Sequence, residues 1–157
     1  MRAILVCLLL LALPKGAYAQ VDYGAFEHRF TLNCGRPDSL NLVQNKRFID
    51  SLSAVGVSAN EEQFLRDRSM LSYQFYLLWK KEEDLIKAKD DALACWERFR
   101  NTACLWDLGT MYRVLGDCDR AIQYTERYIQ EVPEERVNFK QVYLRYKLCR
   151  GTGREQR

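Results

Sequence analysis

Cysteine and histidine are the residue types best suited to metal binding, redox chemistry or nucleophilic attack, and this chain has six cysteines but one histidine. A zinc site needs thiols or imidazoles at short paired spacings, and a thiol–disulfide enzyme needs a C-x-x-C pair with a stabilised thiolate. Neither spacing occurs among the cysteines. We therefore expect no metal, no cofactor and no redox catalysis.

The single histidine, His28, is also the one candidate general base. It lies beside charged residues in a stretch without helical periodicity, where an exposed side chain is expected. Two acidic pairs, Glu82-Glu83 and Asp90-Asp91, could suggest carboxylate catalysis. On a helix, however, neighbouring side chains point in different directions, so these carboxylates are expected to be solvated at the helix surface. No hydrolase motif occurs, and no helix follows the glycines at 151–153 to form a phosphate-binding loop. We therefore do not expect this chain to be an enzyme. An enzyme with an active site outside the known motifs is a distant alternative.

The first 19 residues have the pattern of a secretory signal peptide. Arg2 precedes an apolar run at 3–13, and Ala17-Tyr18-Ala19 forms a small-residue cleavage site. The run is shorter than the roughly 20 apolar residues that span a bilayer. We expect cleavage after Ala19 and a secreted or periplasmic protein without stable membrane insertion. An uncleaved membrane anchor is the alternative.

Removal of this peptide changes the charge balance and the cysteine count. Without Arg2 and Lys15, the 24 basic residues become 22 against 21 acidic ones, a net charge of +1. That balance argues against a nucleic-acid partner, which requires a concentrated basic excess. Export also exposes thiols to oxidising conditions. Five cysteines remain, an odd number that leaves one unpaired or paired with another chain: Cys34, Cys95, Cys104, Cys118 and Cys149.

Helical periodicity fills most of the chain beyond an irregular or extended lead-in at 20–36. Asp38 is a candidate N-cap, and Ser58 with Glu61 predicts a capping box. Gly56 and Pro133 are predicted to end helices. No segment alternates like a β-hairpin, so we predict an all-α fold with a disordered tail at 151–157. Helices are expected over about 38–53, 59–81 with a candidate break at Asp67, 83–98, 102–115, 119–131 and 134–149.

One segment resembles the tetratricopeptide repeat, in which Leu-Gly-x2-Tyr on one helix is followed by a turn glycine, an alanine and a proline. The resemblance implies that Gly109 and Ala121 allow two helices to approach closely. The packing residues are Leu108, Gly109, Tyr112, Gly116, Ala121 and Pro133. The segment departs from the pattern at Leu105, where tryptophan is usual, and at Thr125, where phenylalanine is usual. A generic helix pair is the alternative.

Weaker copies flank this segment. Phe75, Trp79, Ala88, Ala92 and Cys95 lie about 33 residues upstream of matching places, with Tyr76 in place of the glycine. Downstream, Phe139, Val142 and Tyr146 fit the first helix of a further unit, which would act as a cap. The resemblance implies a short right-handed stack of antiparallel helical hairpins, a TPR-like α-solenoid, over 67–150. A helical extension with one or two helices is expected over 20–66.

The stacking of helices also suggests disulfide pairs. Cys95 and Cys104 fall at adjoining helix ends, as do Cys118 and Cys149, so the resemblance implies the pairs Cys95–Cys104 and Cys118–Cys149. Small buried thiols in reduced form are the alternative. Cys34 would then be the odd cysteine.

In proteins similar to this repeat, the first helices line a groove for a partner peptide or helix. Carried over by spacing, the groove residues are Tyr73, Leu77, Lys80, Trp106, Thr110, Arg113, Lys140, Leu144 and Lys147. Their aromatic and basic character favours a partner with apolar anchors and some negative charge. The alternative is that Trp106 belongs partly to the core and the basic residues only solvate the surface.

Two functions follow as hypotheses. The first is a protein–protein interaction module, an adaptor or assembly factor of the periplasm or cell envelope that binds another exported protein. The second is a secreted effector or structural subunit that acts through residues 20–66, as a disulfide-linked homodimer through Cys34.

Overall fold

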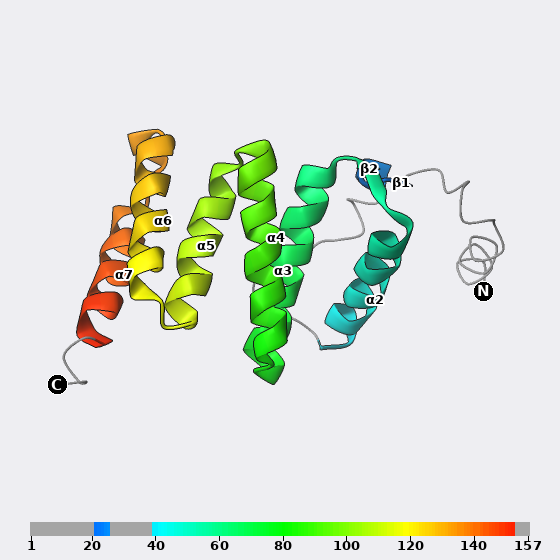
Figure 1. Ribbon diagram of the computed structural model, residues 1–157, viewed down its shortest axis with the longest axis horizontal. Helices are drawn as coiled ribbons and strands as arrows, with labels where there is room; N and C mark the ends of the chain where they lie inside the picture. Colours follow the sequence, from blue (N-terminus) through cyan, green and yellow to red (C-terminus); the bar gives the residue numbers. More distant parts are fainter. Residues whose placement is uncertain (1–20, 26–38, 153–157) are drawn as a thin grey trace.

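The computed structural model describes residues 21–25 and 39–152 (Figure 1). The predicted signal peptide, His28, Cys34 and Asp38 lie outside these residues. Within them the fold is all-α, as predicted. The helices are α2 (Ser39–Val55), α3 (Glu61–Trp79), α4 (Glu82–Phe99), α5 (Thr102–Val114), α6 (Cys118–Glu131) and α7 (Phe139–Thr152).

The helices follow one another in a row along the long axis of the molecule (Figure 1). Each packs on the next in sequence, most extensively α3 on α4, α4 on α5 and α5 on α6. From α3 to α6 the connections are only two or three residues long, such as Lys80-Lys81 and Arg100-Asn101, and they force consecutive helices to run antiparallel. Helices α2 and α7 lie at the two ends of the row, where α7 packs on α6.

Local capping explains where the central helices begin and end. The side chains of Asn101 and Asp117 accept hydrogen bonds from the backbone amides of Ala103 and Arg120, at 2.9 and 3.0 Å. Gly116 turns the chain between α5 and α6 with a φ of 82°, a left-handed conformation that glycine adopts without a steric cost. The predicted helices at 83–98, 102–115 and 119–131 therefore match α4, α5 and α6 to within one residue at each end.

The first turn of α3 differs from the prediction. Asn60 occupies the N-cap position with a φ of 58° and makes no side-chain capping hydrogen bond. The predicted capping box of Ser58 and Glu61 is wrong, because Ser58 belongs to a short strand and the helix begins only at Glu61. Beyond that turn α3 continues without a break through Asp67.

The ends of α7 also differ from the prediction. A short 3-10 helix, η3 (Glu134–Arg136), follows Pro133, and α7 begins at Phe139 rather than near residue 134. Asn138 sets this start, since its Oδ1 accepts a hydrogen bond from the Gln141 amide at 3.2 Å. At its other end α7 continues to Thr152, into the stretch that was expected to be disordered.

A small parallel β-pair, which the sequence did not predict, ties the lead-in to the helices. Strand β1 (Val21–Asp22) pairs with β2 (Val57–Ala59), with Val21 opposite Val57. A 3-10 turn, η1 (Tyr23–Ala25), follows β1. The ring of Tyr23 is fully buried, and its hydroxyl donates to the Asp67 carboxylate at 2.6 Å.

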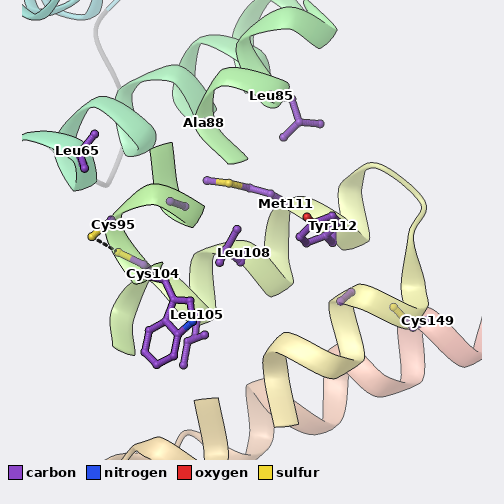
Figure 2. Packing of buried hydrophobic residues seen from close by; sticks show 13 residues of the cluster. Leu65, Leu85, Ala88, Cys95, Cys104, Leu105, Leu108, Met111, Tyr112 and Cys149 are labelled. Carbon is purple, nitrogen blue, oxygen red and sulfur yellow. Dashed lines mark hydrogen bonds between the residues drawn. The ribbon is translucent and has the colours of Figure 1, made fainter. Parts of the chain in front are cut away.

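Two hydrophobic clusters form the core. The smaller one joins η1, α2 and α3, and consists of Tyr23, Leu42, Ile49, Leu52, Phe64, Leu71 and Phe75. The larger one runs from α3 to α7 and includes Leu85, Ala88, Leu105, Leu108 and Ala121 (Figure 2). Helix α3 contributes to both clusters, through Leu65 on one side and Phe64 on the other.

The closest approach of α5 and α6 occurs at Gly109. A Cβ atom there would lie 2.9 Å from the Thr125 hydroxyl and 3.2 Å from the Ala121 carbonyl oxygen, and would overlap the guanidinium of Arg145. Ala121 is fully buried opposite. The missing side chain therefore lets the two helices and Arg145 meet in one place.

We expect Gly109→Ala to destabilise the protein by about 1–2 kcal/mol, because overpacking outweighs the gain in helix propensity. Gly151→Ala is the matched control, since nothing lies within 4 Å of a Cβ at this helical position. Chemical denaturation of both variants measures the difference. Equal stabilities of the two variants would contradict the close approach.

Candidate partner-binding recess between α3, α5 and α7

Arg145 of α7 is buried between α5 and α6, with 6% of its surface exposed. Its Nη1 donates to the Thr125 hydroxyl at 3.0 Å and its Nη2 to the Thr110 hydroxyl at 2.6 Å. The guanidinium lies over the ring of Trp106, 3.6 Å from the ring centroid. One arginine therefore joins three helices through two hydrogen bonds and a cation–π contact.

Helical spacing explains why this arginine points inward. Val142, Arg145 and Cys149 are separated by three and four residues, so they share one face of α7, and all three are buried. Gly109 leaves room for the guanidinium on α5. Trp106 also contacts Tyr128 of α6, with the ring centroids 5.3 Å apart.

The charges around Arg145 do not balance. No carboxylate of the described residues lies within ion-pair distance of Arg145, Arg113 or Arg66. Burial lowers the pKa of Arg145 to about 10, and nearby Arg113 acts in the same direction, while Asp107 opposes them. The guanidinium nevertheless stays charged at neutral pH.

Asp107 is the one carboxylate in this region. Burial raises its pKa to about 6, against the opposing effects of Arg66 and Arg145. At neutral pH the region therefore holds three guanidiniums and one carboxylate. We call the group of neighbouring residues that α3, α5 and α7 contribute here the basic recess, defined by their charges and contacts: Arg66, Tyr73, Trp106, Asp107, Thr110, Arg113 and Arg145.

Tyr73 is the aromatic residue that α3 contributes to the basic recess. Burial raises the pKa of its hydroxyl, and the positive charges of Arg113 and Arg145 oppose this rise. Its ring stacks on Tyr76 with the centroids 6.4 Å apart. The recess thus combines aromatic surface with uncompensated positive charge.

The structure brings together only part of the predicted groove. Tyr73, Trp106, Thr110 and Arg113 meet around Arg145. Leu77 and Lys80 are exposed at the end of α3, where the Lys80 amine lies over the Tyr76 ring. The remaining predicted residues are exposed on the face of α7 opposite its buried face: Lys140, Leu144 and Lys147.

Sequence reasoning missed Arg66, Asp107 and Arg145. A signal for Arg145 was present, because it lies three residues after Val142 and four before Cys149, on the face that the apolar spacing marks as buried. Asp107 and Arg66 carried no such signal. Their proximity depends on how α3 packs beside α5.

The predicted cysteine pairs lie at adjoining helix ends. The Sγ atoms of Cys95 and Cys104 are 2.7 Å apart and both residues are buried (Figure 2). The hydrogen bond donated by Cys104 lowers the pKa of Cys95, and the same contact together with burial raises that of Cys104. Burial and a side-chain hydrogen bond with Cys118 raise the pKa of Cys149 to about 12. Each predicted pair is thus in contact, and its oxidation stays a prediction.

The described residues show neither a metal-binding cluster nor a membrane-spanning helix. Residues 21–25 and 39–152 contain no cluster of three or more His, Cys, Asp or Glu side chains placed to hold a metal ion. In the same part of the chain, no helix is both long and apolar enough to cross a bilayer. Comparisons with family models, curated proteins and solved structures gave no match.

We expect both cysteine pairs to oxidise to disulfides in an oxidising compartment. Alkylation of the unfolded, non-reduced protein should then leave these four cysteines unmodified, and peptide mapping should recover Cys95 joined to Cys104 and Cys118 joined to Cys149. Each bond should contribute about 2–4 kcal/mol by restricting the unfolded chain. Four alkylated thiols, or exchanged partners, would show that the prediction is wrong.

We expect Asp107→Asn to stabilise the protein at pH 7 by about 1 kcal/mol, since the folded chain favours the protonated carboxyl. Because the pKa of Asp107 is raised, its contribution to stability falls as pH rises from about 4, the pKa in the unfolded chain, through about 6, the pKa in the folded chain. The gain should therefore disappear below pH 4. Thermal melts of both proteins at pH 7 and pH 3.8 test this, and a gain that is the same at both values would exclude it.

Proposed function

We propose that this chain is an exported protein–protein interaction module, in which a TPR-like stack of helical hairpins holds an acidic segment of another exported protein at the basic recess. The pairs α3–α4 and α5–α6, followed by the single helix α7, support the stack. The close approach of Gly109 to Ala121 and Thr125 supports the same interpretation.

The single observation that carries the proposed function is the uncompensated positive charge of the basic recess. Arg66 and Arg113 make no ion pair within the described residues, and Asp107 offsets only one of the three guanidiniums. A region of excess positive charge beside Tyr73 and Trp106 favours a partner that supplies carboxylates and apolar anchors. An acidic peptide segment meets both requirements.

The proposal also includes the compartment. The signal-peptide pattern at 1–19 favours secretion or the periplasm, and two cysteine pairs in contact suit an oxidising environment. No catalytic activity is proposed, because the one carboxylate of the recess, Asp107, does not activate the Thr110 hydroxyl, which donates to the Trp106 carbonyl and accepts from Arg145. The role proposed is that of an adaptor or assembly factor.

Site-specific photocrosslinking tests this function. A photoreactive amino acid at Arg113 should crosslink the native partner in the secreted or periplasmic fraction, whereas the same amino acid at Gln123, exposed on α6, should not. With a photoreactive group at Tyr73 instead, Arg113→Glu should reduce the crosslinked product about tenfold or more, because the recess loses its excess positive charge.

Arg47→Glu is the charge-matched control for Arg113→Glu. Arg47 is exposed on α2, a helix that contributes no residue to the recess, so the same change in net charge there should leave crosslinking unchanged. An equal loss of crosslinked product in Arg113→Glu and Arg47→Glu would mean that the partner responds only to the net charge of the protein. Equal crosslinking from Arg113 and Gln123 would rule out the recess as the binding site.

A further inference from the structure

Helix α7 leaves one side uncovered at the end of the row. It buries Val142, Arg145 and Cys149, but Phe139 is 52% and Tyr143 66% exposed. A hollow on this side is lined by Tyr143, Tyr146, Lys147, Arg150 and Gly151.

Helix α5 of the same chain shows how the equivalent side of a helix is covered in this row. Leu105, Gly109 and Tyr112 of α5 lie 34 residues before Phe139, Tyr143 and Tyr146 of α7. On α5 these positions are buried, because α6 packs on them. In the same way α4 packs on α3. Helix α7 repeats the spacing of α5, yet no described element occupies the corresponding place.

The charges beside the uncovered side select the kind of helix that fits it. From Phe139 to Thr152 there is no acidic residue, whereas Lys140, Lys147 and Arg150 are exposed along the helix. Glu126 of α6 also lies at this side, where it accepts a hydrogen bond from the Tyr146 hydroxyl at 3.2 Å, so the excess charge of the side is positive. A second copy that docked its own α7 here would place like charges opposite one another, which is unfavourable. Negative charge on the incoming helix complements these residues.

We propose that α7 binds an acidic amphipathic helix of a partner protein, which packs over Phe139, Tyr143 and Tyr146 as α6 packs on α5. Leucine-type side chains at three- and four-residue spacing would fill the hollow beside Tyr146, and flanking glutamates or aspartates would meet Lys147 and Arg150. Tyr143 stands where α5 has Gly109, so a small residue of the incoming helix faces it.

This surface is distinct from the basic recess. Residues two apart on a helix point to nearly opposite sides, so Tyr143 faces away from Arg145, which enters the recess. The proposal therefore extends beyond the proposed function and does not depend on it. Binding at the two surfaces is separable by mutation.

Fluorescence anisotropy with the full chain tests the proposal. The probe is a labelled synthetic peptide of about 18 residues, with leucine and alanine on one face and glutamate on the other, long enough to cover a helix of this length. A peptide of the same composition, with its leucines distributed around the helix, is the reference. We expect the amphipathic peptide to bind at least about tenfold more tightly.

Variants then locate the binding. Tyr143→Asp and Lys147→Glu should each weaken binding of the acidic peptide about tenfold or more, and Lys147→Glu should strengthen binding of a peptide with lysine in place of glutamate. Gln123→Asp, on the exposed side of α6, is the control and should leave the affinity unchanged. Tyr143 is exposed, so its replacement should also leave the thermal melting curve unchanged.

Several results would overturn the proposal. These are equal binding of the two peptides, no binding of either at millimolar concentration, or an affinity that Tyr143→Asp does not change. A dimer in sedimentation that Tyr143→Asp dissolves would assign the surface to a second copy instead. Loss of peptide binding in Arg113→Glu but not in Tyr143→Asp would place the peptide in the recess. Loss of partner crosslinking at the recess, with peptide binding intact, would refute only the proposed function.

Discussion

The absence of a side chain at Gly109 is the constraint on which the central part of the molecule depends. It allows α6 to approach α5 so closely that Thr125 and the Ala121 carbonyl lie against the helix, and it leaves space for the guanidinium of Arg145. Arg145 in turn fixes α7, because its hydrogen bonds reach one threonine on each of the two preceding helices. A cation buried in this way needs compensation for its lost hydration, which the two hydroxyls and the Trp106 ring supply in place of a carboxylate.

The contact between α3 and α4 is held together differently. Arg68 of α3 donates two hydrogen bonds to Asp91 of α4, at 2.7 and 2.6 Å, and Ser69 donates to the Ala88 carbonyl at 2.8 Å. Asp91 is buried, so loss of Arg68 would leave an unpaired charge in the interface, a larger cost than the net value of the pair. These directional bonds fix the register of α3 on α4, whereas shape fixes the register of α5 on α6. The same row of helices is therefore specified by two kinds of interaction.

Most of the helices could be predicted from the sequence because their signals are local. Asn101, Asp117 and Gly116 act on residues within one turn, and the three- and four-residue spacing of Leu85, Ala88 and Ala92 marks a buried face without knowledge of its neighbour. The later start of α7 depends on the Asn138 cap, which the glutamates at 134 and 135, themselves typical of a first helical turn, obscured in the sequence. The β-pair of Val21 with Val57 joins residues far apart in sequence, and so has no local signal. The burial of Arg145 depends on a gap above Gly109 that only the packed helices create, which is why the recess was predicted only in part.

Packing between neighbours along the sequence has a consequence for how the chain acquires its structure. Every extensive helix contact joins elements that are consecutive in the chain, so the loops that must close are short and the entropy lost in closing them is small. Folding then requires no encounter between the two ends of the molecule, and each new helix finds its binding surface already formed by the one before it. A polypeptide that leaves the ribosome with its amino end first presents its helices in the same order. The row of helices is in this respect suited to folding during synthesis, one hairpin after another.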